Sequence, residues 1–425
     1  MMALNRISRG GFRSSRVWML VAGVVWGLSA SVWGADRAAV QASLEKHLTS
    51  GDFQGAVREF EAHLAADPAD DHSRFALGMT RLLTAVERLS QNLFRYGLRV
   101  SAPDLPVLRL PVPENPHPEP LTYPQMRAVL QQLIDDLAVA ADVLAPIKDP
   151  NVKLHVPVGL IRLDLNGDGK VAPEETFWVI FQKLNPRVGT LTEERQRFAV
   201  GFDAGDVHWM IGYTHVLRAL LETWLAQDSE KFHDVLAPHL FSGAAPQEET
   251  PLQTRRRSGE FVDLDVVADF IAAIHLMSFE LAEPERMPRA RQHLLEMVRQ
   301  SRLSWELIQQ ETDNDGEWIP NPKQSSVVGL SVTDDQVESW QRVMDELEAV
   351  LNGTKLIPHW RLREGTGINL KQVFESPRGF DLVMWAHGGA ALPYAETGEV
   401  VTRQTANTLT AAFGGQFFLF AVWFN

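Results

Sequence analysis

Oxygen-bearing side chains follow one another at short, regular intervals in one segment of the chain. Asp164, Asn166 and Asp168 occupy alternate positions, and Glu175 stands at the twelfth position counted from Asp164. Ca²⁺ in proteins is bound by about six to eight oxygen atoms at roughly 2.3–2.6 Å. The pattern therefore predicts a Ca²⁺ site with ligands from the side chains of Asp164, Asn166 and Asp168, from the backbone carbonyl of Lys170, and from both oxygens of Glu175.

The same segment, 164–175, resembles an EF-hand calcium loop. Gly169 stands where that loop needs a sharp turn, and Val171 is apolar where two such loops usually pair. Apolar residues at helical spacing follow, at Phe177, Ile180, Phe181 and Leu184. Pro157 and Gly159 restrict any preceding helix to about one turn, which is similar to the short EF-hand-like loops of exported bacterial proteins. A polar turn without metal is the alternative interpretation.

A second acidic segment covers residues 311–322. Four of its residues match the first, third, fifth and sixth positions of the same loop: Glu311, Asp313, Asp315 and Gly316. Pro322 stands where the bidentate carboxylate should be, so the segment is either a degenerate cation site that borrows an acid such as Glu317, or a turn that closes the preceding helix. EF-hand loops usually pair, and we therefore expect Val171 and Trp318 to lie side by side.

Histidines are the alternative candidates for chemistry, at His208, His215, His275 and His387. A hydrolase-like enzyme could assemble an acid–base site from these four residues. No pair has the spacing of a known zinc site, and the sequence has no Gly-x-Ser-x-Gly elbow, phosphate-binding loop or dinucleotide fingerprint. Single histidines on apolar helices more often form hydrogen bonds in the core, so the sequence favours a protein without catalytic residues.

Apolar residues recur at helical spacing along much of the chain, which predicts a fold that is all-α or mostly α. Helices are expected at residues 123–144, 173–184, 206–227, 260–282, 286–310 and 335–352. Short extended pieces are expected at residues 355–362 and 368–374. The apolar run Thr408–Phe424 is interrupted by two glycines and a glutamine, which indicates a buried element and not a membrane span.

Residues 38–79 resemble a tetratricopeptide repeat. Gly51 ends one helix, Ala56 allows close packing, and Phe60 and Leu64 share one helical face. The resemblance covers one and a half repeats and implies a helical hairpin docked on the rest of the chain, with binding of a partner peptide as an alternative. The predicted domains are this hairpin at 35–100, a Pro-rich linker at 101–124, and a helical domain with the calcium loop at 125–425.

The N-terminal residues 1–34 have the layout of a secretory signal peptide, with four arginines, an apolar run and small residues before Ala35. The chain has no cysteine and a formal net charge of −14. Disulfides and Cys-bound metals are therefore excluded, and nucleic acid is a poor partner. These features predict a periplasmic or secreted calcium-binding helical protein with a binding or scaffold role and a protein partner. The alternative is the histidine-based hydrolase.

Overall fold

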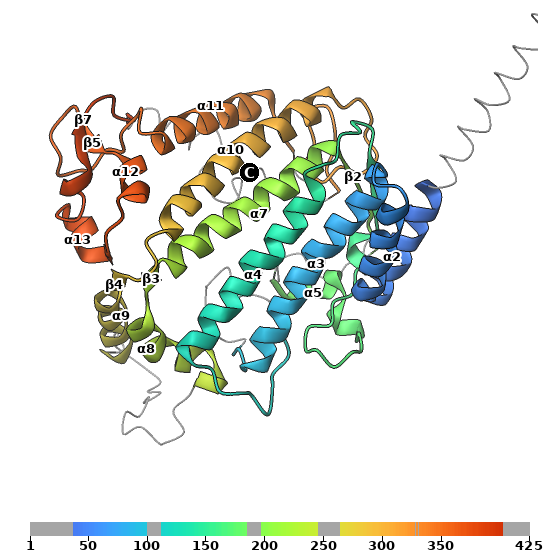
Figure 1. The fold of residues 1–425 in the computed structure, drawn as a ribbon, viewed down its shortest axis with the longest axis horizontal. Coiled ribbons are helices and arrows are strands. Elements are labelled where there is room, and N and C mark those ends of the chain that lie inside the picture. The colour runs from blue at the N-terminus through green and yellow to red at the C-terminus, as the bar shows by residue number, and fades with distance from the viewer. Residues whose placement is uncertain are drawn as a thin grey trace, which may run out of the picture.

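The computed structural model describes residues 37–99, 112–184, 197–244, 264–327, 329 and 331–402. Long helices lie side by side in one layer (Figure 1). In spatial order they are α2 (Phe53–Ala66), α3 (Asp71–Arg95), α4 (Tyr123–Leu144), α7 (Ala204–Leu225), α10 (Arg286–Gln310) and α11 (Asp334–Leu351). The mostly α-helical fold predicted from the apolar periodicity is confirmed.

Several of these helices begin at a capping box, in which a side chain accepts a hydrogen bond from the first turn and a side chain in that turn bonds back. Thr122 starts α4 in this way, with a proline just inside the helix, and Thr333 starts α11. Asp203 does the same for α7, where it pairs with Asp206. These polar caps fix where each helix begins and leave the apolar faces free to pack.

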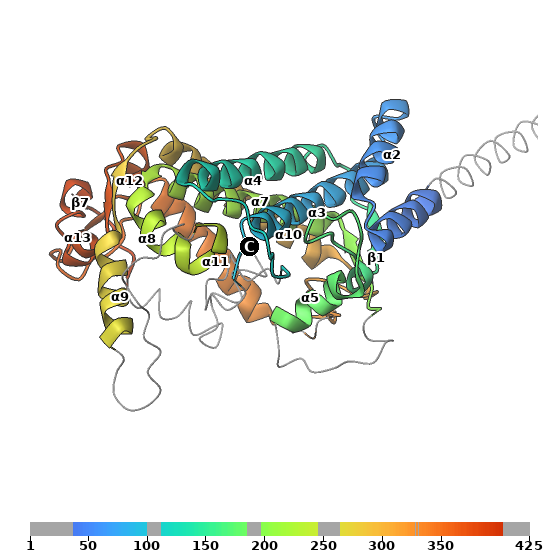
Figure 2. The ribbon, with the colours of Figure 1, turned by 90° about the horizontal axis from the view of Figure 1, so that it is seen from below.

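The shorter elements lie at the two ends of the layer (Figure 2). α5 (Phe177–Leu184) and β1 (Lys153–Val156) lie at the end occupied by α2. α9 (Leu264–Leu276) and α13 (Leu382–His387) lie at the opposite end. The remaining short helices and turns are η2 (Val158–Leu160), η3 (Pro173–Glu175), α8 (Glu230–Leu240), η5 (Ser242–Ala244), α12 (Leu370–Glu375) and η6 (Leu392–Tyr394).

Strands are short and antiparallel. β1 pairs with β2 (Val200–Asp203) so that Lys153 stands opposite Asp203. A three-stranded sheet holds β3 (Gln227–Asp228), β4 (Ser278–Leu281) and β6 (Phe380–Asp381), and β5 (Thr366–Ile368) pairs with β7 (Ala395–Thr397). The β1–β2 pair matters most for the site below, because it brings the start of α7 next to residue 153.

Two secondary-structure predictions are wrong, each for a local reason. The helix expected to reach residue 282 ends at Leu276, because the next residues form β4 between two other strands. Residues 368–374 were expected to be extended but contain most of α12, which Asn369 caps by accepting a hydrogen bond from Gln372. Residues 355–362 contribute only isolated bridges at Leu356 and Ile357.

The main core joins the N-terminal helices to the region around residues 152–165. A helix described over residues 37–50 packs with α2, α3, β1, β2 and the first half of α7 around a shared apolar cluster. Fully buried members include Leu48, Phe53, Phe60, Phe75 and Leu144. Burial of this apolar surface provides the main favourable term for holding the hairpin on the layer.

Some predictions fall on residues outside the described ranges, namely the signal peptide at 1–34, residues 101–111 of the Pro-rich linker, and Thr408–Phe424. Residues 112–122 of the linker contain no helix and lie along the end of α3, where the Glu119 N–H donates to the Arg95 carbonyl over 2.9 Å. No helix in the described ranges combines the length and the apolar character that crossing a bilayer requires.

Candidate metal centres

The loop 164–175 begins with a carboxylate that organises its backbone. Asp164 Oδ1 accepts a hydrogen bond from the Gly167 N–H at 2.7 Å, and Asp164 Oδ2 accepts one from the Gly169 N–H at 2.9 Å. Both glycines have φ of +74°, a conformation that other residues rarely adopt. The chain therefore winds tightly around the Asp164 carboxylate, with the turn at Gly169 where the sequence predicts it.

The next two predicted ligands form similar short-range bonds. Asn166 Oδ1 accepts from the Asp168 N–H at 3.0 Å, and Asp168 Oδ1 accepts from the Lys170 N–H at 2.8 Å. These side chains are thereby held close to the backbone of the loop and not extended into solvent. The loop residues 167–170 are exposed, so a cation can reach them from water.

Glu175 folds back across the entrance of the loop. Its Oε1 accepts from the Leu165 N–H at 2.9 Å, and its Oε2 accepts from the Ala172 N–H at 2.7 Å. The residue is 5% exposed and ends the 3₁₀ turn η3, two residues before α5 begins at Phe177. A β-bridge between Arg162 and Thr176 joins the two ends of the loop. Each carboxylate oxygen has a second lone pair that remains suitable for a cation.

The loop is attached to α3. Glu87 Oε1 accepts from the Asp164 N–H at 2.8 Å, and Gln91 donates to the Asp164 carbonyl at 3.0 Å. Burial raises the pKa of Glu87 to about 7, and the nearby charges of Asp164 and Glu175 raise it further against the hydrogen bond that lowers it. Glu87 is thus a fourth acid at the loop, and its place on a distant helix explains why the loop pattern did not identify it.

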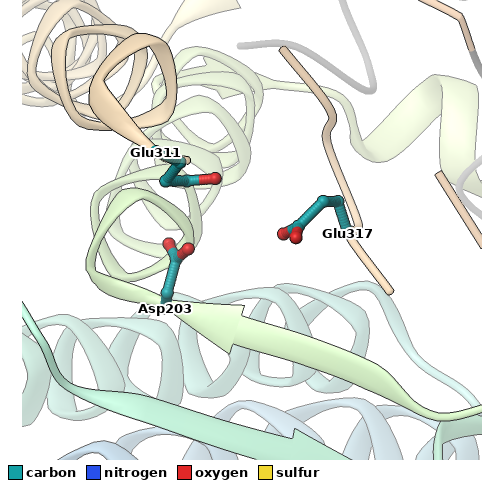
Figure 3. Close-up of side chains that lie close together, drawn as sticks. All are labelled: Asp203, Glu311 and Glu317. Carbon is teal, nitrogen blue, oxygen red and sulfur yellow. The ribbon is translucent and has the colours of Figure 1, made fainter. Parts of the chain in front are cut away.

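The side chains of this loop are not gathered around one point. Among the described residues, the one group of three His, Asp or Glu side chains whose ligand atoms all lie within 4.8 Å of one another is Asp203, Glu311 and Glu317 (Figure 3). Binding of Ca²⁺ in the loop therefore requires Asp164, Asp168 and Glu175 to move closer together than they lie here.

The Asp203–Glu311–Glu317 group is built from three separate elements. Asp203 ends β2 and caps α7, Glu311 follows the last residue of α10, and Glu317 forms a parallel bridge with Ser326. The Gly201 N–H donates to the Gly316 carbonyl at 3.0 Å, which attaches the segment 311–322 to β2. This contact brings acids that are about one hundred residues apart in sequence into one site.

Burial dominates the electrostatics of this group. It raises the pKa of Glu311 to about 9, helped by the charge of Asp203. It also raises the pKa of Asp203, of Glu317 and of the fully enclosed Asp206, which lies beside Asp203. A cluster of buried carboxyls cannot ionise completely without a compensating cation, and Glu311 retains its proton at neutral pH.

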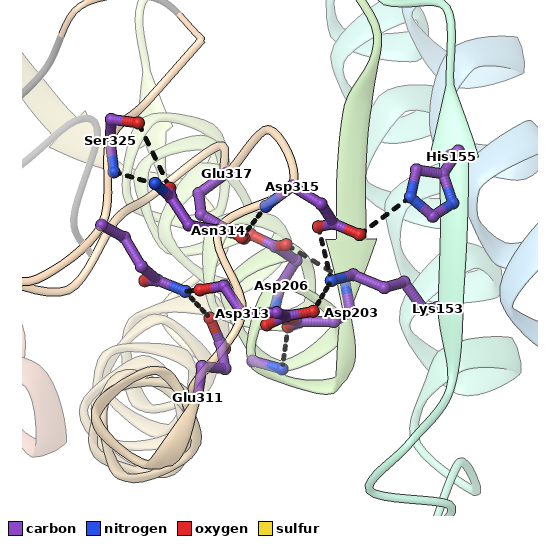
Figure 4. A network of polar contacts seen from close by, with 12 residues as sticks. Lys153, His155, Asp203, Asp206, Glu311, Asp313, Asn314, Asp315, Glu317 and Ser325 are labelled. Carbon is purple, nitrogen blue, oxygen red and sulfur yellow. Dashed lines mark hydrogen bonds and ion pairs between the residues drawn. The ribbon is translucent and has the colours of Figure 1, made fainter.

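Lys153 provides a positive charge at the edge of the cluster (Figure 4). Its Nζ donates to Asp313 Oδ2 at 2.6 Å and to Asp315 Oδ1 at 2.7 Å, and His155 Nε2 lies 3.1 Å from Asp315 Oδ2. Burial alone would lower the pKa of Lys153, but the hydrogen bonds to the two aspartates raise it. A pocket of about 460 Å³ opens here, and Lys153, Asp203, Glu311 and Asp313 are among its lining residues.

The second predicted loop therefore forms a different arrangement. Glu311 joins the three-carboxylate group, whereas Asp313 and Asp315 bind Lys153. The sequence indicated Glu317 as an acid that could be borrowed but did not indicate Asp203, whose only local signal is the capping pattern with Asp206.

The expected pairing of the two loops is wrong. The described residues show no bridge or backbone hydrogen bond between Val171 and Trp318. The Trp318 ring packs against Phe202 and Trp209, with 6.1 Å between ring centroids in each case. The physical reason is that Gly316 accepts a hydrogen bond from Gly201 of β2 and Glu317 forms a bridge with Ser326. Phe202 of β2 then lies against the Trp318 ring, where Val171 was expected.

The four histidine candidates do not converge. His208 Nδ1 lies 2.7 Å from Gln300 Oε1, and His215 Nδ1 lies 2.9 Å from the Nδ1 of His293. His275 and His387 are exposed, on α9 and at the end of α13. Within the described part of the chain none of the four belongs to the three-ligand group.

Comparison with protein-family models, with curated proteins and with solved structures found no match for this chain.

Proposed function

We propose that this protein binds Ca²⁺ in the loop 164–175 and that the bound ion fastens the N-terminal helices to the helical layer. The observation that carries the proposal is the backbone winding around Asp164, whose two oxygens accept the N–H groups of Gly167 and Gly169. Together with the return of Glu175 to the entrance, this arrangement supports an EF-hand-like loop whose ligands would move closer together when Ca²⁺ binds.

Repulsion between acidic side chains favours the binding of a cation in the loop. Asp164, Asp168, Glu175 and the neighbouring Glu87 crowd four acidic side chains into one region. A divalent ion would replace their mutual repulsion by attraction and would return Glu87 to its ionised form. Extracellular calcium modules bind with a Kd on the order of 10⁻⁴–10⁻³ M, which suits the proposed exported location.

The fastening role follows from what the loop contacts. The Arg162 N–H donates to the Leu48 carbonyl at 3.0 Å, and the Val171 side chain lies against Gly51 in the turn before α2. Glu87 and Gln91 attach the same loop to α3. A chain without cysteine cannot use disulfides, so a metal ion is the remaining strong cross-link available to an exported scaffold or binding protein.

The test compares thermal unfolding in 5 mM Ca²⁺ and in EGTA. A ligand that binds only the native state stabilises it by RT ln(1 + [L]/Kd), which is about 1–2 kcal/mol for the affinity range above. We expect the melting temperature to rise with Ca²⁺, and hydrogen exchange of residues 37–66 to slow.

The matched variants are Glu175→Gln and Glu174→Gln, because Glu174 is the exposed neighbour of the buried Glu175. Glu175→Gln should lose the calcium effect and Glu174→Gln should keep it. A wild-type melting temperature that does not respond to Ca²⁺ would contradict the proposed function.

A weaker second cation site at Asp203, Glu311 and Glu317 is supported by one observation, namely that the three carboxylates already lie within ligand distance of one another. A cation there must displace the proton that Glu311 retains and compete with Lys153 for the surrounding acids. Binding at this group should therefore be weaker than in the loop 164–175 and should strengthen as the pH rises.

A further inference from the structure

Two imidazole rings meet inside the interface between α7 and α10, which lie side by side in the middle of the layer (Figure 1). His215 on α7 and His293 on α10 have their Nδ1 atoms 2.9 Å apart, and their ring centroids are separated by 5.1 Å. Both residues are partly buried. Neither histidine belongs to the loop 164–175 or to the Asp203–Glu311–Glu317 group.

The chemistry of this contact depends on the number of protons. An Nδ1···Nδ1 hydrogen bond needs one nitrogen that carries a hydrogen and one that does not. When both rings are protonated, each Nδ1 carries a hydrogen and each ring a positive charge. The contact then changes from a hydrogen bond into a repulsion between two like charges at short distance.

The surroundings do not compensate for a second positive charge. The charged groups that face the pair come from α7 and α10 and are Arg218, Glu222, Arg289, Glu296 and Arg299. Asp135 and Asp142 of α4 lie close to Arg218. Glu222 is already bound by Arg286 at 2.9 Å and by Arg289 at 3.3 Å. Glu296 is bound by Arg299 and by Gln300.

Burial lowers the pKa of both histidines to about 4. For His215 the next causes are His293 and Arg218, and for His293 the next cause is Arg218. Because a neutral ring is favoured in the fold, the unfolded chain binds more protons between pH 6.5 and pH 4. The stability that the pair contributes is complete above about pH 6.5 and is lost as the pH falls through this window.

We propose that His215 and His293 form an acid-sensitive latch that holds α7 against α10 while at least one ring is neutral and releases the two helices when both rings are protonated. The release would separate the two halves of the helical layer. α2, α3 and α4 would remain on one side, and α11 would remain on the other.

The experiment uses the full chain in EGTA and measures unfolding by denaturant at pH 7 and at pH 5. One histidine whose pKa falls from 6.5 in the unfolded chain to about 4 in the fold raises the unfolding constant at pH 5 up to about thirtyfold over its value at pH 7. Because the rings are partly exposed, we expect a factor of roughly ten for each ring. His293→Gln keeps a neutral hydrogen-bonding side chain and removes the second charge. Between pH 7 and pH 5 the unfolding constant of the wild type should rise by a factor at least ten times larger than that of His293→Gln.

The matched control is His208→Gln. His208 lies at the same helix interface but faces the neutral amide of Gln300 at 2.7 Å and not a second imidazole. This variant should keep the wild-type pH dependence. Hydrogen exchange should show loss of protection in α7 and α10 of the wild type at pH 5, after correction for intrinsic rates, with protection retained in His293→Gln.

The proposal is overturned if His293→Gln and the wild type have the same pH dependence, or if α7 and α10 keep their protection at pH 5. If His293→Gln does not fold, His215→Gln provides the same comparison from the other helix. If neither variant folds, the test is an NMR titration of the wild type that follows the ring-proton resonances of the two histidines against pH. Titration of both rings near pH 6.5 would then contradict the latch.

Discussion

Glu311 and Asp203 lie together at the end of α10 and the start of α7, and burial keeps Glu311 protonated at neutral pH. The folded-state pKa of about 9 lies above the ordinary value of 4.5. Folding therefore takes up a proton between these two pH values. The stability associated with Glu311 is complete below pH 4.5 and is lost as the pH rises towards 9.

Replacing Glu311 by glutamine should therefore stabilise the metal-free protein at pH 8. The amide resembles the protonated acid but does not titrate, so we expect a gain of about 1–2 kcal/mol at pH 8, after allowance for solvent screening, and little change at pH 4.5. Denaturant unfolding in EGTA measures this difference. The variant should also lose the weak second calcium-binding event.

The control for this prediction is Glu306→Gln, an exposed position on the same helix, which should not alter the pH dependence. A Glu311→Gln protein that is less stable than the wild type at pH 8 in EGTA would show that the ionised carboxylate is the favourable form. The assignment of Glu311 as a protonated group would then be wrong.

Single residues were predictable from sequence where the signal is local. Asp164, Asn166 and Asp168 stand close together in the chain, and their spacing alone indicates the turn that the structure shows. Glu87 and Asp203 were not predictable as parts of acidic sites. Each reaches its site through the packing of a distant element, and an acid on a helix or at a cap is common without such a role.

At the scale of elements, helix packing depends on a few close approaches. Gly78 lies inside α3 and faces Leu144 of α4, and a Cβ atom at position 78 would come within 2.3 Å of Leu144 Cδ2. α3 begins at Asp71 and continues to Arg95, so this glycine lies in the interior of the helix. The glycine is explained by this close packing and not by a helix end.

Gly78→Ala should therefore destabilise the protein although alanine favours helix by about 1 kcal/mol. The atoms that would have to yield belong to the Leu144 side chain, which is fully buried, so overpacking costs about 1–3 kcal/mol. Denaturant unfolding checks the sign. Leu144→Val in the same background should recover part of the loss, whereas an unchanged or raised stability of Gly78→Ala would contradict the close α3–α4 contact.

Long helices were predicted well because their apolar period of 3.6 residues is repeated over several turns. The boundaries of α4, α10 and α11 agree with the expected ranges to within two residues. The elements that failed are short. α12 has six residues and β4 has four, so neither contains enough periods to separate helix from strand, and the partners of β4 lie far away in sequence.

At the scale of the whole molecule, the loop 164–175 lies where the N-terminal helices meet the layer. One side of the loop contacts Leu48 and Gly51, and the other contacts Glu87 and Gln91 of α3. The sequence predicted the loop and the hairpin separately but gave no sign that they touch. That contact depends on the shared apolar core, which no local pattern encodes.

Calcium titration by isothermal calorimetry tests the central claim most directly. At pH 7, wild-type protein freed of metal should bind one Ca²⁺ in the loop 164–175 with a Kd on the order of 10⁻⁴–10⁻³ M, and binding at the Asp203–Glu311–Glu317 group should be weaker. Glu174→Gln should bind equally well, and Glu175→Gln should bind at least tenfold more weakly because it loses one charged bidentate ligand. An isotherm without a binding event in the wild type, or one that Glu175→Gln leaves unchanged, would contradict the assignment of residues 164–175 as a calcium loop.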